Sequence, residues 1–147
     1  IVRVDVAPLR AVMEAGYMPV VAPIALQRQR GPVRHGTSAL LNINADTVAG
    51  AIAAALGARR LVFLTDVPGI CDRAGAVLSR LTAEEARKLM ATGVIAGGMI
   101  PKAEACLQAV ASGAEALVLD GRSPHALLNG LEGRSEGTRI VPEGAHP

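Results

Sequence analysis

Gly97 and Gly98, with Lys102 shortly after them, form the pattern in this sequence that is best suited to binding phosphate. Two glycines at the start of a helix leave its first backbone N–H groups open to an anion, and the helix dipole adds positive potential there. A lysine in the first turn brings a full positive charge to the same place. The pattern is neither G-x-x-x-x-G-K-[ST] nor G-x-G-x-x-G, so it predicts an anion site unlike the common nucleotide loops.

Other polar residues that are able to take part in binding or catalysis lie next to apolar segments. Asp66 follows the run RLVFLT, Asp120 follows EALVLD, and the run NINAD, which contains Asn44 and Asp46, precedes an alanine-rich segment. In open α/β sheets, ligands bind beyond the carboxyl ends of the strands, so these residues are candidates for a binding site. Each also has a plain structural explanation, because Asn44 and Asp46 are common helix caps and the segment DVPG after RLVFLT suits a turn.

The strands that must position these residues are predicted from short runs of Val, Ile and Leu. Continuous apolar runs that end in a polar residue are typical of strands buried on both faces of a parallel sheet. We expect strands at Met18–Ile24, Arg60–Thr65, Glu115–Asp120 and Thr138–Val141.

The helices are predicted from caps and stops. Thr82 and Glu85 have the spacing of a capping box, and glycines follow several of the helical segments. We expect helices from Asp5 to Ala15, from Asn44 or Asp46 to Leu56, from Thr82 to near Gly93, from Met99 to Ser112, and a short one capped by Ser123. The polar, basic segment between Ile24 and Asn42 is predicted to be an exposed hairpin or loop. The alternation of strand and helix indicates a single α/β layered domain with parallel strands.

Composition excludes several classes of protein. The 147 residues are 50% hydrophobic, 19% charged and 1% aromatic, with a net charge of +2. A dispersed, nearly balanced charge with few aromatic side chains gives no support for nucleic-acid binding, and no apolar run approaches the roughly 20 residues of a membrane span. Cys71 and Cys106 form neither a disulfide framework nor a zinc motif, so a cytoplasmic location is expected. His35, His125 and His146 are interpreted as surface or structural residues.

Three stretches carry a resemblance to a known family. The run LLNINADTVAGAIAAALGARRLVFLTDVPGI, then LTAEEARKLMATGVIAGGMIPKAEACLQAV, and then DGRSPHALL with GTRIV, resemble the amino acid kinase family from about Val4 to Val141. The resemblance implies an α/β three-layer αβα sandwich with a mostly parallel sheet. It also implies that residues 1–147 are the C-terminal ATP-binding part of the family's domain. The family's N-terminal portion, with a Gly-rich phosphate loop and a first catalytic lysine, is missing, so together with the start at Ile1 a fragment is expected.

The stretch DGRSPHAL favours the branch of the family that phosphorylates the side-chain carboxylate of N-acetyl-L-glutamate in arginine biosynthesis. The resemblance implies that Lys102 stabilises charge on the transferring phosphoryl group, that Asp46 orients the catalytic lysines, and that Asn42 binds the acyl amino acid. It implies that ATP is bound by Asp66, Val67, Pro68, Gly69, Ile70 and Cys71 and by Val94, Ile95, Ala96, Gly97 and Gly98. Mg²⁺ would arrive on ATP, with no dedicated metal site on the chain, and the parent protein is expected to be a homo-oligomer.

Two alternatives remain open at this stage. The acceptor of the same reaction could be a related carboxylate, such as aminoadipate bound to a carrier protein, because the missing part would hold most of the acceptor pocket. A chain without the first lysine and the Gly-rich loop could also act as a catalytically silent nucleotide-binding or regulatory module. We expect the isolated chain to bind ATP weakly without phosphorylating an acceptor.

Overall fold

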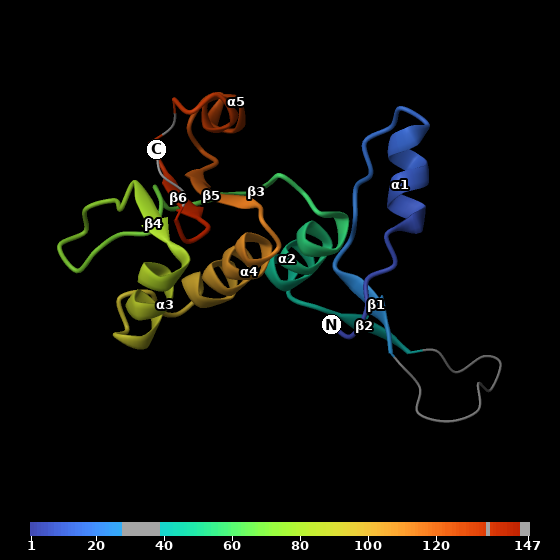
Figure 1. Ribbon diagram of the computed structural model, residues 1–147, viewed down its shortest axis with the longest axis horizontal. Coiled ribbons are helices and arrows are strands. Elements are labelled where there is room, and N and C mark those ends of the chain that lie inside the picture. The colour runs from blue at the N-terminus through green and yellow to red at the C-terminus, as the bar shows by residue number, and fades with distance from the viewer. Residues whose placement is uncertain (28–38, 135, 145–147) are drawn as a thin grey trace.

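A four-stranded mixed sheet is the centre of the fold (Figure 1). The computed structural model describes residues 1–27, 39–134 and 136–144. The strand order is β3 (Arg60–Thr65), β5 (Glu115–Asp120), β6 (Thr138–Val141) and β4 (Arg80–Thr82). β3 pairs with β5 and β4 with β6 in parallel, whereas β5 and β6 are antiparallel. The predicted bounds of β3, β5 and β6 are confirmed, and two of the three strand pairs are parallel, as expected for a mostly parallel sheet, whereas the β5–β6 pair is antiparallel.

Helices cover both faces of this sheet, as the resemblance implied. Alternate side chains of β5 point to opposite faces, and Ala116 and Val118 pack in the main core with residues of α3 (Ala83–Ala91) and α4 (Met99–Ala111). α2 (Ala45–Leu56) lies beside α4 (Figure 1). On the other face, α5 (Ala126–Leu131) packs against Leu119. β5 is buried, whereas β3 forms one edge of the sheet and leaves half of Leu64 exposed, so the prediction that β3 is buried on both faces is wrong.

The local signals in the sequence set most of the helix ends. Thr82 and Glu85 form the predicted capping box of α3, in which the side chain of each residue accepts the backbone N–H of the other. Asn44 caps α2 by accepting the N–H of Thr47 at 3.1 Å, so Asn44 rather than Asp46 is the N-cap of this helix. The predicted Ser123 cap is wrong, because α5 begins later and its N-cap position is His125, with φ +58°. Residues 124–125 therefore form a turn before the helix.

Residues 1–27 and 39–43 lie on the far side of α2 from the sheet (Figure 1). They contain α1 (Ala7–Glu14) and an antiparallel hairpin of β1 (Ile24–Leu26) and β2 (Leu40–Asn42). Asp5 accepts the N–H of Ala7 at 3.1 Å near the start of α1. The hairpin agrees with the prediction for the flanks of the basic segment, whose residues 28–38 lie outside the described residues.

The predicted strand Met18–Ile24 is wrong in all but its last residue. β1 starts only at Ile24, and the side chains of Met18 and Val20 are 88% and 95% exposed. Two prolines within the segment lack the N–H that a ladder needs, and no strand pairs with it in the described part of the chain. An apolar run without a partner strand cannot form the hydrogen bonds of a ladder, so most of this segment stays outside the sheets and exposed.

Candidate functional site

Asp46 and Lys102 form an ion pair between two helices. Lys102 Nζ donates to Asp46 Oδ2 at 3.0 Å, and the side chains are 26% and 17% exposed, respectively. Asp46 lies in the first turn of α2, and Lys102 in the first turn of α4. Because Asn44 is the cap of α2, the Asp46 carboxylate is free to hold the lysine. The structure thus brings together two site residues that lie 56 positions apart.

Chain connections place this pair at one edge of the sheet. Residues 57–59 join α2 to β3, and residues 112–114 join α4 to β5, so each helix runs antiparallel to the strand that follows it. The N-termini of α2 and α4 therefore lie on the side of the carboxyl ends of β3 and β5. This is where open α/β sheets bind ligands, and both helix dipoles add positive potential there.

Gly50 lets the two helices approach closely, one turn after Asp46. A methyl group at Gly50 would lie 2.8 Å from Cα and Cβ of Ala105 and 3.0 Å from its carbonyl oxygen. Ala105 is fully buried in α4, one turn after Lys102. The spacing between the helices, and with it the reach of Lys102 toward Asp46, is set by backbone contact at Gly50.

Cys106 lies in the core next to this helix contact. Its side chain has no exposed surface, and burial, with a smaller effect of the nearby Asp46 carboxylate, raises the pKa of its thiol to about 12. The thiol is therefore neutral and unreactive at physiological pH. Cys106 acts as an apolar packing residue here.

The predicted nucleotide loop, Asp66–Cys71, starts at the carboxyl end of β3. Thr65 Oγ1 accepts the Val67 N–H at 3.2 Å and lies 2.8 Å from the Val67 carbonyl oxygen. Asp66 and Pro68 are exposed, whereas Gly69 and Ile70 are buried. The loop is thus held at both ends, and its exposed middle faces solvent.

The second predicted nucleotide segment, Val94–Gly98, joins α3 to α4. The N–H groups of Val94 and Ile95 both bind the Leu89 carbonyl oxygen, and the Ile95 side chain is in the core. Gly97 has φ +55° and, like Gly98, is exposed at the start of α4. Of this segment, the residues open to a ligand are therefore Ala96, Gly97 and Gly98, next to the turn that carries Lys102.

Asp120 ends β5 at the same edge, beside Asp66. Arg122 binds it through two side-chain nitrogens at 2.9 and 2.8 Å and through its backbone N–H at 3.0 Å. The hydrogen bonds from the Arg122 side chain, then the one from its backbone, lower the pKa of Asp120 to about 2. In turn, the hydrogen bonds and charge of Asp120, with a smaller effect of the Asp66 carboxylate, raise the pKa of the Arg122 guanidinium. This edge therefore carries the Asp120 carboxylate, which Arg122 holds in place, the exposed Asp66 and the exposed guanidinium of Arg122.

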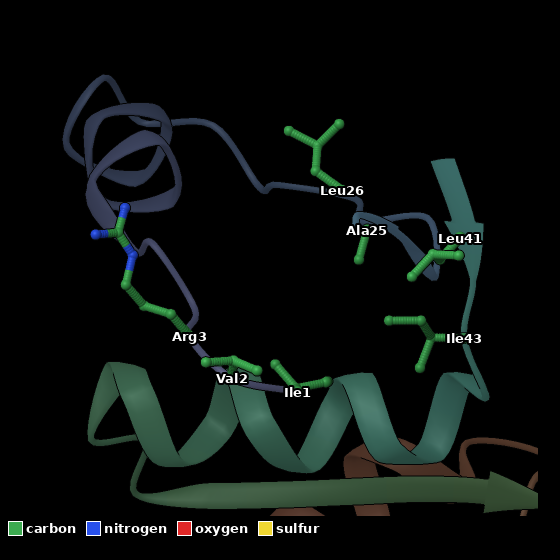
Figure 2. A pocket seen from close by; sticks show the side chains of 7 residues that line it. All are labelled: Ile1, Val2, Arg3, Ala25, Leu26, Leu41 and Ile43. Carbon is green, nitrogen blue, oxygen red and sulfur yellow. The ribbon is translucent and has the colours of Figure 1, made fainter. Parts of the chain in front are cut away.

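Asn42, the predicted acceptor-binding residue, is exposed at the end of β2. Nearby, a cavity of about 690 Å³ separates the first residues from the hairpin, lined by Ile1, Val2, Arg3, Ala25, Leu26, Leu41 and Ile43 (Figure 2). Figure 2 shows these residues above α2, with Arg3 directed toward α1. Apart from Arg3 this lining is apolar, so the cavity lacks the converging polar groups that are typical of a ligand site.

Neither a metal cluster nor a membrane span occurs within the ranges the structure describes. No three His, Cys, Asp or Glu side chains there are grouped to hold a metal ion. None of the helices in that part is long and apolar enough to cross a membrane.

A mixed sheet between helices, with a lysine–aspartate pair and an exposed glycine pair at the carboxyl ends of β3 and β5, defines an α/β protein with a candidate anion-binding site. Residues 1–120 match the amino acid kinase family, and the chain belongs to that family.

Relatives and solved structures agree with this assignment. The chain is 52% identical over 127 residues to an acetylglutamate kinase of Gluconacetobacter diazotrophicus, covering 86% of this chain and 38% of the relative. It is 42% identical over 141 residues to an acetylglutamate kinase of Dehalococcoides mccartyi, covering 96% of this chain and 51% of the relative. The N-acetylglutamate synthase of Neisseria gonorrhoeae, complexed with coenzyme A and N-acetyl-glutamate, superposes with a TM-score of 0.82 at 26% identity, covering 99% of this chain and 32% of the other. The chain spans about a third to a half of the length of these proteins.

Two residues that shape the site were not predicted from the sequence. Gly50 had a weak signal, since a glycine inside an alanine-rich helix costs about 1 kcal/mol relative to alanine and needs a packing reason. Thr138, at the start of β6, had no signal, because its partner lies in a loop 68 residues away. Both act through contacts between segments far apart in the sequence.

Proposed function

We propose that residues 1–147 form the C-terminal, ATP-binding part of an acetylglutamate kinase. The enzyme would transfer the γ-phosphoryl group of ATP to the side-chain carboxylate of N-acetyl-L-glutamate, giving an acyl phosphate and ADP. The observation that carries this proposal is the Lys102–Asp46 pair at 3.0 Å, held at the starts of two helices on the carboxyl side of β3 and β5. The names of the relatives with 42–52% identity support the choice of acceptor.

Lys102 is the catalytic cation in this proposal. In phosphoryl transfer the protein mainly positions the reactants and stabilises negative charge. An ammonium group is a compact charge suited to a phosphoryl oxygen, and the N-terminus of α4 adds its dipole. Asp46 holds this ammonium in place through the ion pair at 3.0 Å.

ATP would be held beside this pair by the loop Asp66–Cys71 and by the exposed residues Ala96, Gly97 and Gly98. The open backbone of the two glycines suits the phosphates, and Asn42 offers an amide donor and acceptor to the acyl amino acid. Mg²⁺ would enter on the triphosphate and neutralise part of its charge. It needs few ligands from the protein when it is bound this way.

The setting of the enzyme is also part of the proposal. Cys71 and Cys106 are both free thiols, which supports a reducing, cytoplasmic compartment. We propose that the complete enzyme is a homo-oligomer, as the family resemblance implies.

A chimaera tests the proposed reaction. Residues 1–147 would replace the matching part of the Gluconacetobacter diazotrophicus relative, and acyl phosphate would be trapped with hydroxylamine. We expect turnover with N-acetyl-L-glutamate, little with N-acetyl-L-aspartate or aminoadipate, and a loss of turnover in the Lys102→Ala variant. The Lys88→Ala variant, which removes a lysine from α3, is the matched control and should keep its activity.

Two outcomes would contradict the proposal. A folded chimaera that binds ATP but forms no acyl phosphate would favour the silent nucleotide-binding module. Turnover with aminoadipate above that with N-acetyl-L-glutamate would assign the chain to a different acceptor.

A further inference from the structure

Thr138, at the start of β6, is a fully buried polar residue in the described part of the chain. Its hydroxyl oxygen accepts the N–H of Ile70 at 2.8 Å and lies 3.4 Å from the Ile70 carbonyl oxygen, to which it donates. A single side chain thus binds both backbone groups of one loop residue, much as a neighbouring strand would. Ile70 belongs to the loop Asp66–Cys71, whereas Thr138 belongs to the sheet.

Gly69 makes this contact possible. A methyl group at Gly69 would lie 2.8 Å from Thr138 Oγ1 and 3.1 Å from the Thr138 backbone nitrogen. Gly69 also has φ +155°, which side chains rarely adopt. The loop backbone therefore rests directly on Thr138, and a larger residue at position 69 would lift it away.

The two backbone groups of Ile70 depend on Thr138 to different degrees. The carbonyl oxygen also accepts the N–H of Leu78 at 2.8 Å, so it keeps a partner without Thr138. The N–H has the Thr138 hydroxyl as its partner, and a buried N–H without a partner costs about 1–3 kcal/mol. Without this hydroxyl, the loop lowers its free energy by moving the Ile70 N–H toward water or another acceptor.

We propose that Thr138 is a positioning residue for nucleotide binding, which fixes the loop Asp66–Cys71 in its binding conformation without touching the nucleotide. This inference rests on the proposed role of the loop in binding ATP. A loop that spends less time in its binding conformation binds its ligand more weakly by the same factor. The chemistry at Lys102, on a different element, stays the same once ATP is bound.

The test compares three variants in the chimaera. Thr138→Val keeps the shape but removes the hydroxyl, and we expect the KM for ATP to rise about 10-fold with kcat changed less than about 2-fold, because uniform binding is lost. Thr138→Ser keeps the hydroxyl and should restore the KM. Ile140→Val, in the same strand and fully buried, is the control for a general loss of stability and should leave the KM unchanged.

A second measurement uses the isolated chain and needs no activity. Hydrogen exchange of the Ile70 amide should be faster in Thr138→Val and normal in Thr138→Ser. Gly69→Ala reaches the loop without changing β6, and it should raise the KM for ATP as Thr138→Val does. Gly69→Ala therefore tests the inference if Thr138→Val fails to fold.

The outcomes separate this inference from the proposed function. A wild-type chimaera without ATP binding would overturn both. Normal wild-type binding, with an unchanged KM in Thr138→Val or a KM that Thr138→Ser does not restore, would overturn the inference alone.

Discussion

A single methyl group at Gly50 should disturb the Asp46–Lys102 pair from a distance. The added Cβ would lie 2.8 Å from Cα and Cβ of Ala105, whereas carbon atoms normally pack at about 3.5–4.0 Å. Most of the clash is with the backbone of α4, which a rotamer change cannot relieve. We therefore expect Gly50→Ala to separate α2 and α4 by about 1 Å near the site.

The energetic effect has two parts of opposite sign. Overpacking costs about 1–3 kcal/mol, and alanine in place of glycine inside a helix returns about 1 kcal/mol. A net loss of about 1 kcal/mol would lower the Tm by roughly 2–4 °C for a chain of this size. Movement of about 1 Å at the ion pair should lower kcat of the chimaera by as much as about 100-fold.

Cys106 reports the helix separation directly. Its thiol is fully buried next to Ala105, so it should react very slowly with a thiol reagent in the wild type and faster in Gly50→Ala. The Cys71→Ser background removes the partly exposed second thiol. Gly130→Ala in α5 is the matched control, because its methyl would meet the movable end of Leu119 on the opposite face of the sheet. A Gly50→Ala variant with an unchanged or higher Tm and a wild-type thiol rate would refute this reasoning.

Three further predictions concern charged groups at the same edge of the sheet. Lys102→Ala in the chimaera should lower kcat more than it raises the KM for ATP, and steady-state kinetics with a changed KM and a normal kcat would contradict this. Asp46→Asn should lower kcat with little change in Tm, because Asn44 caps α2; near-normal turnover would reduce Asp46 to a structural residue. Because the pKa of Asp120 is lowered to about 2, its contribution to folding is present above pH 4 and is lost as the pH falls toward 2. Arg122→Gln should therefore raise that pKa toward its ordinary value in an NMR titration of the Asp120 carboxyl carbon, and an unmoved titration would show that Arg122 is not its cause.

Much of the fold could be predicted from local signals. The capping box at Thr82 was found from the sequence because a helix end is stabilised by residues three positions apart. β3 and β5 were found with their observed bounds because each is a single apolar run between turn residues. β4 was missed as a strand, since three residues carry too short a pattern to be distinguished from a loop. Their positions at the starts of predicted helices made Lys102 and Asp46 candidates, and the family resemblance assigned their roles.

The sequence by itself determined which segments form helices, because a helix makes its hydrogen bonds within four residues and carries its own caps. Tertiary structure alone decided the strand direction of β6, the fate of the apolar run Met18–Ile24 and the pairing of Lys102 with Asp46. A strand needs a partner that its own sequence does not contain, so Met18–Ile24 remained mostly unpaired. The site depends in the same way on contacts between distant segments, such as Thr138 with Ile70, whose spacing is set by how the sheet and helices pack.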